Sequence, residues 1–250
     1  MKSFFDVLNN RRTILYKVII SLRQLLVVIV CFFAILNFAQ ANQNSSNIGQ
    51  TLHKEIKGNT ADDAKKFIET ILDEIYKELP SKTSNNNKYT YLESFTTQIF
   101  DFPYMSAWSL GTYYRNLKPA DKKKYLAISK KYMVLTYGNV FDNSYQLYTF
   151  RTTGAEQQGN DYLVSLMAKT KRRRAAKSEN EVIDIVWKIR YKAKENRFYI
   201  VDVSLNNIAF LSVQRSSFQS IYKDSKQNPK VFLQKLQEKV NGKKKELGVS

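Results

Sequence analysis

Few side chains in this sequence could carry out nucleophilic or metal chemistry. The 250 residues include one histidine, His53, and one cysteine, Cys31. Zinc and copper sites use several His or Cys ligands, so we expect neither metal here. Catalysis by a Ser–His or Cys–His pair would depend on His53, which lies in a polar stretch without an acidic cluster. We therefore interpret His53 as a solvated linker residue and predict no metal and no cofactor.

A pair of carboxylates is the remaining candidate for catalysis. Asp101 and Asp202 could act together as a general acid and a general base. Each also has a simpler structural explanation. Asp101 precedes a helix that has Pro103 in its first turn, which is typical of a cap, and Asp202 lies near a strand end, where it can accept bonds from backbone. No neighbouring residue offers a reason for a perturbed pKa, so we predict that this protein is not an enzyme.

The first half of the chain has the apolar periodicity of helices. Thr60 is a good N-cap, and Pro80 ends the pattern that follows it. Further helices are predicted from about Tyr89, over Asp101 to Arg115, from Pro119 through Phe141, over Ile208 to Tyr222, and over Pro229 to Val240.

Between these helices the apolar residues alternate with a period of two. Four strands are predicted, at 145–152, 162–169, 181–192 and 197–203. In the third strand, Ile185 and Trp187 face one way while Lys188 and Arg190 face the other. Gly154 and Gly159 are assigned to the first turn. Helices, a four-stranded meander and helices again predict an α+β fold in one domain.

The N-terminal segment has the order of a secretory signal. Lys17 and Arg23 precede twelve apolar residues, Leu25 to Leu36, and the small-x-small site Ala39–Ala41 follows. Twelve helical residues cover about 18 Å, less than a hydrocarbon core of about 30 Å. We predict that residues 1–41 are a signal peptide cleaved after Ala41 and that the protein is periplasmic. The alternative is an uncleaved anchor, because the part before the apolar run is long.

The charge of the chain favours anionic partners. The formal net charge is +18, and the segment before Asn42 holds only five of the basic residues. For an exported chain, an anionic membrane surface is a better partner than nucleic acid. With 43% hydrophobic and 13% aromatic residues, the chain has enough apolar surface for a core or for the walls of a cavity.

Several short motifs resemble those of the MlaC family, also called toluene-tolerance auxiliary proteins. They are, in order, Phe100–Pro103, Leu110–Arg115, Thr136–Gly138, Phe198–Val203 and Gln214–Phe218. The resemblance covers Thr60 to about Val240. The family usually has Trp where this chain has Tyr114, and Asn207–Phe210 replaces a common Gly-Val-Ser. These differences bear on the fit of a ligand more than on the fold.

The resemblance implies a fold, a function and partners. The fold would be a twisted, mostly antiparallel four-stranded sheet packed against several helices around an apolar lipid pocket, in a nuclear-transport-factor-like arrangement. Residues 42–59 would be a flexible lead-in, 60–240 the lipid-binding domain and 241–250 a basic tail. The function would be that of a periplasmic phospholipid carrier of the Mla pathway in Gram-negative bacteria, which maintains outer-membrane lipid asymmetry. Its partners would be glycerophospholipid as cargo, the substrate-binding subunit of an inner-membrane ABC transporter, and an outer-membrane lipoprotein–porin complex.

The pocket lining is predicted from the inward strand face and the helices expected to cover it. The predicted lipid-binding residues are Leu110, Tyr137, Phe141, Leu147, Leu166, Ile185, Trp187 and Val213. An error of one residue in a strand would reverse the face of its side chains.

Two alternatives to a phospholipid shuttle stay open. One is a membrane-anchored periplasmic scaffold of a secretion complex, which the long segment before the apolar run favours. The other is a carrier of a hopanoid-type lipid, since residue types do not distinguish these cargoes.

A basic run lies between the second and third strands. Lys171, Arg172, Arg173 and Arg174 are clustered there. They are either a solvated hairpin loop or a docking element for anionic lipid or an acidic partner.

Overall fold

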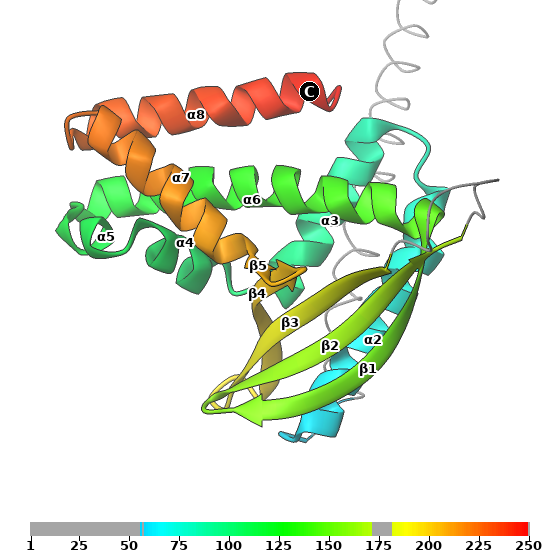
Figure 1. Ribbon diagram of the computed structural model, residues 1–250. Helices are drawn as coiled ribbons and strands as arrows, with labels where there is room; N and C mark the ends of the chain where they lie inside the picture. Colours follow the sequence, from blue (N-terminus) through cyan, green and yellow to red (C-terminus); the bar gives the residue numbers. More distant parts are fainter. Residues whose placement is uncertain (1–55, 57, 172–181, 250) are drawn as a thin grey trace, which may run out of the picture. The chain divides into compact units, whose positions relative to one another are not determined.

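A computed structural model describes residues 56, 58–171 and 182–249 (Figure 1). Cys31, His53, the proposed signal peptide and Arg172–Arg174 lie outside the described residues. Within residues 139–146 only the backbone is described, so the side chain of Phe141 lies outside them as well. In the described parts of the chain, no helix combines the length and apolar character needed to cross a membrane.

Helices and strands follow the predicted order, with labels as in Figure 1. The helices are α2 (Ala61–Glu78), η1 (Leu79–Ser81), α3 (Asn85–Ile99), α4 (Phe102–Leu110), α5 (Thr112–Asn116), α6 (Pro119–Leu147), α7 (Phe210–Asp224) and α8 (Pro229–Glu246). The strands are β1 (Tyr148–Gln158), β2 (Asp161–Thr170), β3 (Val182–Lys192), β4 (Arg197–Leu205) and β5 (Ile208–Ala209).

The sheet is an antiparallel meander in the order β1-β2-β3-β4-β5. The α+β fold and the meander are therefore confirmed, with one short strand more than the four predicted. The extra strand forms because Asn206 and Asn207, both at positive φ, turn the chain back so that Ile208 pairs with Leu205. Two consecutive residues at positive φ are typical of tight hairpin turns, and Asn tolerates them well. The sequence pattern had placed Ile208 in a helix.

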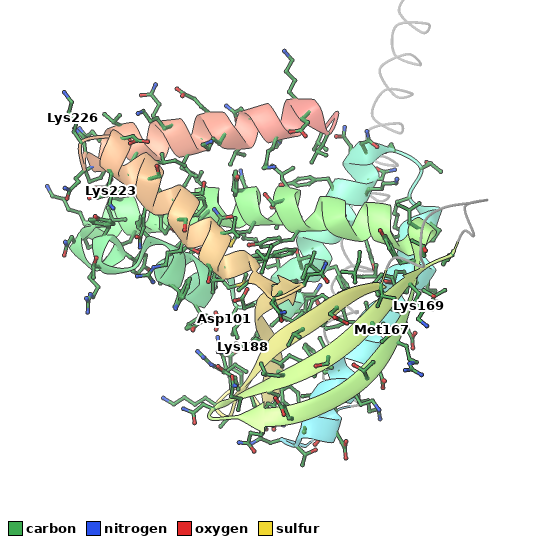
Figure 2. The ribbon with its side chains drawn as sticks, in the orientation of Figure 1. Asp101, Met167, Lys169, Lys188, Lys223 and Lys226 are labelled. Carbon is green, nitrogen blue, oxygen red and sulfur yellow. The ribbon has the colours of Figure 1, made fainter. Side chains whose placement is uncertain are left out.

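One face of the sheet is apolar and the other is polar. Leu166 pairs with Ile185 and Val164 with Trp187, and all four side chains are buried on the inner face. The outer face carries Met167, Lys169 and Lys188, which Figure 2 labels on β2 and β3. This confirms the predicted alternation in the third strand.

Helix α2 covers the inner face of β1 and β2. It begins at a capping box in which the Thr60 hydroxyl accepts from the backbone N–H of Asp63 and the Asp63 carboxylate accepts from the N–H of Thr60. Its buried residues Phe67, Ile71 and Ile75 recur at helical spacing. The cap and the apolar stripe together fix where α2 starts and which side it turns to the sheet.

Other element boundaries differ from those predicted, for local reasons. Helix α3 begins at Asn85 because the Ser84 side chain caps the N–H of Asn87. Helix α6 runs on to Leu147, so β1 begins later than predicted. Gly154 lies inside β1, next to a bulge where the register shifts, and not in the turn. Helix α8 extends to Glu246, so residues 241–246 are helical.

The remaining helices form a second layer with its own contacts. Helix α7 packs on α4, and α8 packs on α6. At the centre lies Tyr125, fully buried, whose hydroxyl donates to the Ser106 carbonyl at 2.8 Å and whose ring contacts those of Phe218 and Phe232. This layer holds α6 and the start of α7 against the inner side of the sheet.

Candidate functional site

An apolar cavity lies between the inner face of the sheet and the helices. Its volume is about 60 Å³. The wall is made of Leu72, Tyr76, Phe100, Met105, Tyr137, Phe150, Leu166, Ile185, Trp187, Val203, Leu205 and Phe210. No charged side chain is among these. The free space is narrow, so an acyl chain could enter only if the walls moved apart.

Stacked rings form the helical side of the cavity. The ring of Tyr137 on α6 lies parallel to that of Phe210, with centroids 5.3 Å apart and planes at 5°. Phe100, between α3 and α4, also stacks on Tyr137, and the centroids of these two rings are 6.5 Å apart. Phe100 also lies 6.5 Å from Trp187 of β3. These contacts connect the helical layer to the sheet across one end of the cavity.

The hydroxyl of Tyr137 is a polar group in this apolar wall. The residue is 7% exposed, and its hydroxyl has no hydrogen-bond partner among the described residues. Burial raises the pKa of Tyr137 far above its ordinary value, and the nearby charge of Asp202 adds to the effect. The hydroxyl therefore stays protonated, and it can donate a hydrogen bond if the wall moves to admit an acceptor.

A wider groove borders the cavity between α2 and β1. Its volume is about 710 Å³. Leu72, Tyr76 and Phe150 line both spaces. The rest of the groove is formed by Glu69, Asp73, Tyr148, Thr149, Arg151, Thr152 and Lys171. An apolar interior thus adjoins a groove that carries charges of both signs.

Four of the predicted lining residues are brought together in the cavity wall: Tyr137, Leu166, Ile185 and Trp187. Leu110 is fully buried but does not line the cavity, because it lies in the helical layer at the end of α4. Leu147 is 49% exposed at the junction of α6 and β1, and Val213 is 56% exposed on the outer side of α7. The side chain of Phe141 lies outside the described residues.

Sequence reasoning missed most of the aromatic residues in the wall. Tyr76 and Phe150 come from α2 and β1, whereas Phe100 and Phe210 lie next to helix ends. The spacing of Leu72 and Tyr76, four residues apart on one helix face, was a usable signal. Phe100 and Phe210 gave no such signal, since residues at element junctions belong to no periodic pattern.

The two candidate acidic residues have the structural roles expected of them. Asp101 caps α4 by accepting from the N–H of Tyr104 and pairs with Lys192 at 2.8 Å. Asp202 accepts from the N–H groups of Val203 and Leu211 at 2.8 and 3.0 Å, and burial raises its pKa despite these bonds. Each carboxylate is thus engaged in local structure. Within the described residues, no three His, Cys, Asp or Glu side chains come together as a metal site.

The fold and the cavity define the class of protein: an α+β domain with an apolar site between an antiparallel sheet and its helices. The sequence profile described as MlaC protein matches residues 65–238. This chain belongs to the MlaC family, as its motifs suggested.

Comparison with solved structures agrees on the fold. A phospholipid-binding protein from Ralstonia solanacearum, solved in complex with a phospholipid, aligns with a TM-score of 0.59 and 12% sequence identity. The alignment covers 74% of this chain and 99% of that one. No curated protein sequence matches this one.

Proposed function

We propose that this protein is a phospholipid carrier that moves lipid between the outer and inner membranes. The observation that carries the proposal is the apolar cavity, lined by twelve aliphatic and aromatic residues, in a chain of the MlaC family. The similar protein from Ralstonia solanacearum holds a phospholipid, which supports the same class of cargo here. On this proposal the protein is a binding protein and not an enzyme, and it requires no cofactor.

The cavity meets the physical requirement for such cargo. Exposing an acyl chain to water costs about 0.8 kcal/mol per CH₂, so a carrier must hide the chain in an apolar space. The narrow cavity has to widen during loading. Tyr76 and Phe150 are half-buried and also border the groove, so they can move outward with less loss of packing than the fully buried lining residues.

The buried hydroxyl of Tyr137 favours a cargo with acceptor oxygens. A buried donor without a partner costs about 1–3 kcal/mol, which a ligand oxygen would recover. Glycerophospholipids carry ester carbonyls next to their acyl chains and could supply this oxygen. A purely hydrocarbon ring system could not.

The location and the partners complete the proposal. We propose that the mature protein lies in the periplasm after cleavage at Ala41. There it would exchange lipid with the substrate-binding subunit of an inner-membrane ABC transporter and with an outer-membrane lipoprotein–porin complex. The basic residues Lys171 to Arg174 are proposed to assist docking, and Lys171 is exposed. Intact mass of the protein from the periplasmic fraction tests cleavage, because a membrane-anchored scaffold would keep Met1.

Lipid extraction from the gently purified protein tests the cargo. We expect mass spectrometry to find glycerophospholipid close to one molecule per protein, and the loaded protein to transfer it to acceptor vesicles. A protein that contains no lipid and takes none up from vesicles would contradict the proposal. Recovery of a polycyclic lipid instead would identify the hopanoid-type alternative.

A further inference from the structure

The basic residues of this protein are unevenly distributed over the fold. Residues 61–99, which contain α2 and α3, have seven acidic and five basic side chains. The helical layer is basic instead, and its charge is concentrated where α5 and the start of α6 meet the turn between α7 and α8 (Figure 1). Residues 112–124 and 222–230 meet there, and they hold eight basic and two acidic side chains.

Ring contacts hold these two segments together. The ring centroid of Tyr113 on α5 lies 4.7 Å from that of Tyr222 on α7, and Tyr125 on α6 lies 5.8 Å from Phe232 on α8. The eight basic residues therefore lie at one end of the helical layer, where Figure 2 labels Lys223 and Lys226. We call this set the basic end, and it consists of Arg115, Lys118, lysines 122–124, Lys223, Lys226 and Lys230.

The charges of the basic end are not neutralised by the protein. All of its side chains except that of Lys122 are exposed, and among the described residues none of the eight forms an ion pair. Lys122 donates to the carbonyl of Arg115 at 3.3 Å, which leaves its charge in place. Cations on the sheet differ in this respect, since Lys188 pairs with Asp161 and Lys192 with Asp101.

Helix stability does not explain all of these positions. Lys223 lies in the last turn of α7, where the helix dipole favours a cation. Lys230, however, lies in the first turn of α8, and Lys122 lies in the first turn of α6, where the dipole disfavours one. The positive ends of α6 and α8 thus add to the potential of these lysines. Attraction of an external anion accounts for such an arrangement better than helix stability does.

The residue types of the basic end fit a lipid surface better than a folded acidic partner. Seven of the eight are lysines, which are flexible point charges, whereas arginine is the residue that matches a fixed carboxylate in a bidentate way. Protein interfaces also have an apolar and aromatic centre. Next to the basic end, Val231 is the one large apolar side chain that is exposed in the described chain. A plane of lipid phosphates demands neither fixed geometry nor an apolar centre.

We propose that the basic end docks this protein on the surface of an anionic phospholipid membrane. Each basic residue near such a surface raises partitioning about five-fold, and the attraction fades beyond about 8 Å at physiological salt. Tyr137 of the cavity wall lies about 20 Å further along α6 than Lys123. The docking surface and the lipid cavity are therefore separate parts of the molecule. The inference adds a membrane contact to the proposed function and does not depend on the cargo.

Cosedimentation with vesicles tests the docking. The protein, purified from cells as it is processed there, is mixed with vesicles of phosphatidylcholine alone or of phosphatidylcholine and phosphatidylglycerol in equal amounts. We expect stronger binding to the anionic vesicles, and this preference should disappear at about 0.5 M salt. The variant Lys123→Gln/Lys223→Gln/Lys226→Gln/Lys230→Gln should lower partitioning to anionic vesicles at least about twenty-fold. Its content of bound lipid should equal that of the wild type.

The matched control removes four exposed lysines outside the basic end: Lys66→Gln/Lys77→Gln/Lys169→Gln/Lys194→Gln. It has the same net charge as the first variant and should lower partitioning no more than about three-fold, through net charge alone. Equal losses in the two variants would overturn the inference and assign the attraction to the whole chain. No preference of the wild type for anionic vesicles would also overturn it and would favour an acidic protein as the partner.

The same samples separate docking from the carrier function. Absence of bound lipid in every protein, with the vesicle results as expected, would contradict the carrier function and leave the docking surface standing. Circular dichroism of both variants shows whether they are folded.

Discussion

The rings of Tyr76 and Phe150 stack with their centroids 5.4 Å apart and their planes at 28°. One comes from α2 and the other from β1, and the pair separates the cavity from the groove. Because both residues are only half-buried, this wall can open without unfolding the core.

Phe150→Ala should therefore open the cavity to the groove. We expect a bound fluorescent phospholipid to be released several-fold faster in stopped-flow transfer to empty vesicles. The free energy of unfolding should fall by about 2 kcal/mol, less than for a fully buried Phe. Thr152→Ala is the control, since Thr152 lines the groove but not the cavity. Equal release rates for the two variants would show that the stacked pair is not the exit.

Filling the cavity should separate lipid binding from folding. Val203 lines the cavity and is 8% exposed, so Val203→Phe should reduce the amount of bound lipid to a small fraction of that in the wild type. Overpacking should cost about 1–3 kcal/mol, which thermal unfolding can measure. Val213→Phe makes the same change at a 56% exposed position and should alter neither quantity. Normal lipid content in Val203→Phe would place the cargo elsewhere.

Gly111 should tolerate no side chain. It lies at φ 64° and ψ −130° between α4 and α5, and an added Cβ would lie 3.0 Å from the Arg215 guanidinium and from the Gln219 amide. Gly111→Ala should lower the stability by about 1–3 kcal/mol in urea unfolding. Gly242 in α8 has open space around it, so Gly242→Ala should be neutral or stabilising by up to about 1 kcal/mol. Similar midpoints for the two variants would contradict the strain at Gly111.

The ion pair on the outer face of the sheet should make stability depend on acid pH. Arg190 donates to both carboxylate oxygens of Asp161, at 2.6 and 3.0 Å, and Lys188 lies 3.4 Å away. Burial alone would raise the pKa of Asp161, but the bonds and charge of Arg190, with Lys188, outweigh it and lower the pKa. A carboxyl with a lowered pKa stabilises the fold above the unfolded value near 3.9 and loses this contribution as the pH falls through the folded value.

Asp161→Asn should accordingly cost about 1–3 kcal/mol at pH 7. The difference from the wild type should shrink as the pH falls below about 4, as measured by urea unfolding at a series of pH values. Asp62→Asn removes an exposed carboxylate in the first turn of α2 and is the control for the loss of one negative charge. A constant difference for Asp161→Asn across the acid range would assign its effect to packing and not to charge.

The fold followed from the sequence where local patterns and caps agree. Thr60 and Pro80 bracket α2, and the alternation through Trp187 gave both the strand and its inner face. Asp101 and Asp202 were identified as structural groups because a cap and a strand-end acceptor have recognisable neighbours. Each of these predictions depends on residues close together in the chain.

The cavity wall was harder to predict because it depends on how distant elements pack. Val213 lies on the exposed side of α7, although its residue type suits a wall. Leu110 is also an apolar residue that would suit a cavity wall. Because α4 packs on α7, however, its side chain is buried between helices and not in the cavity. Phe100 and Phe210 reach the cavity only because the junctions where they lie meet over the sheet.

The order of the strands also has a kinetic consequence. Each strand of the meander pairs with its neighbour in sequence, so the hairpins are local and can form early. The cavity, in contrast, needs Leu72 from α2 and Phe210 from α7, which are far apart in the chain. Loading must therefore follow the assembly of these elements. A chain cut before α7 would leave the inner face of the sheet uncovered, and we expect such a fragment to aggregate.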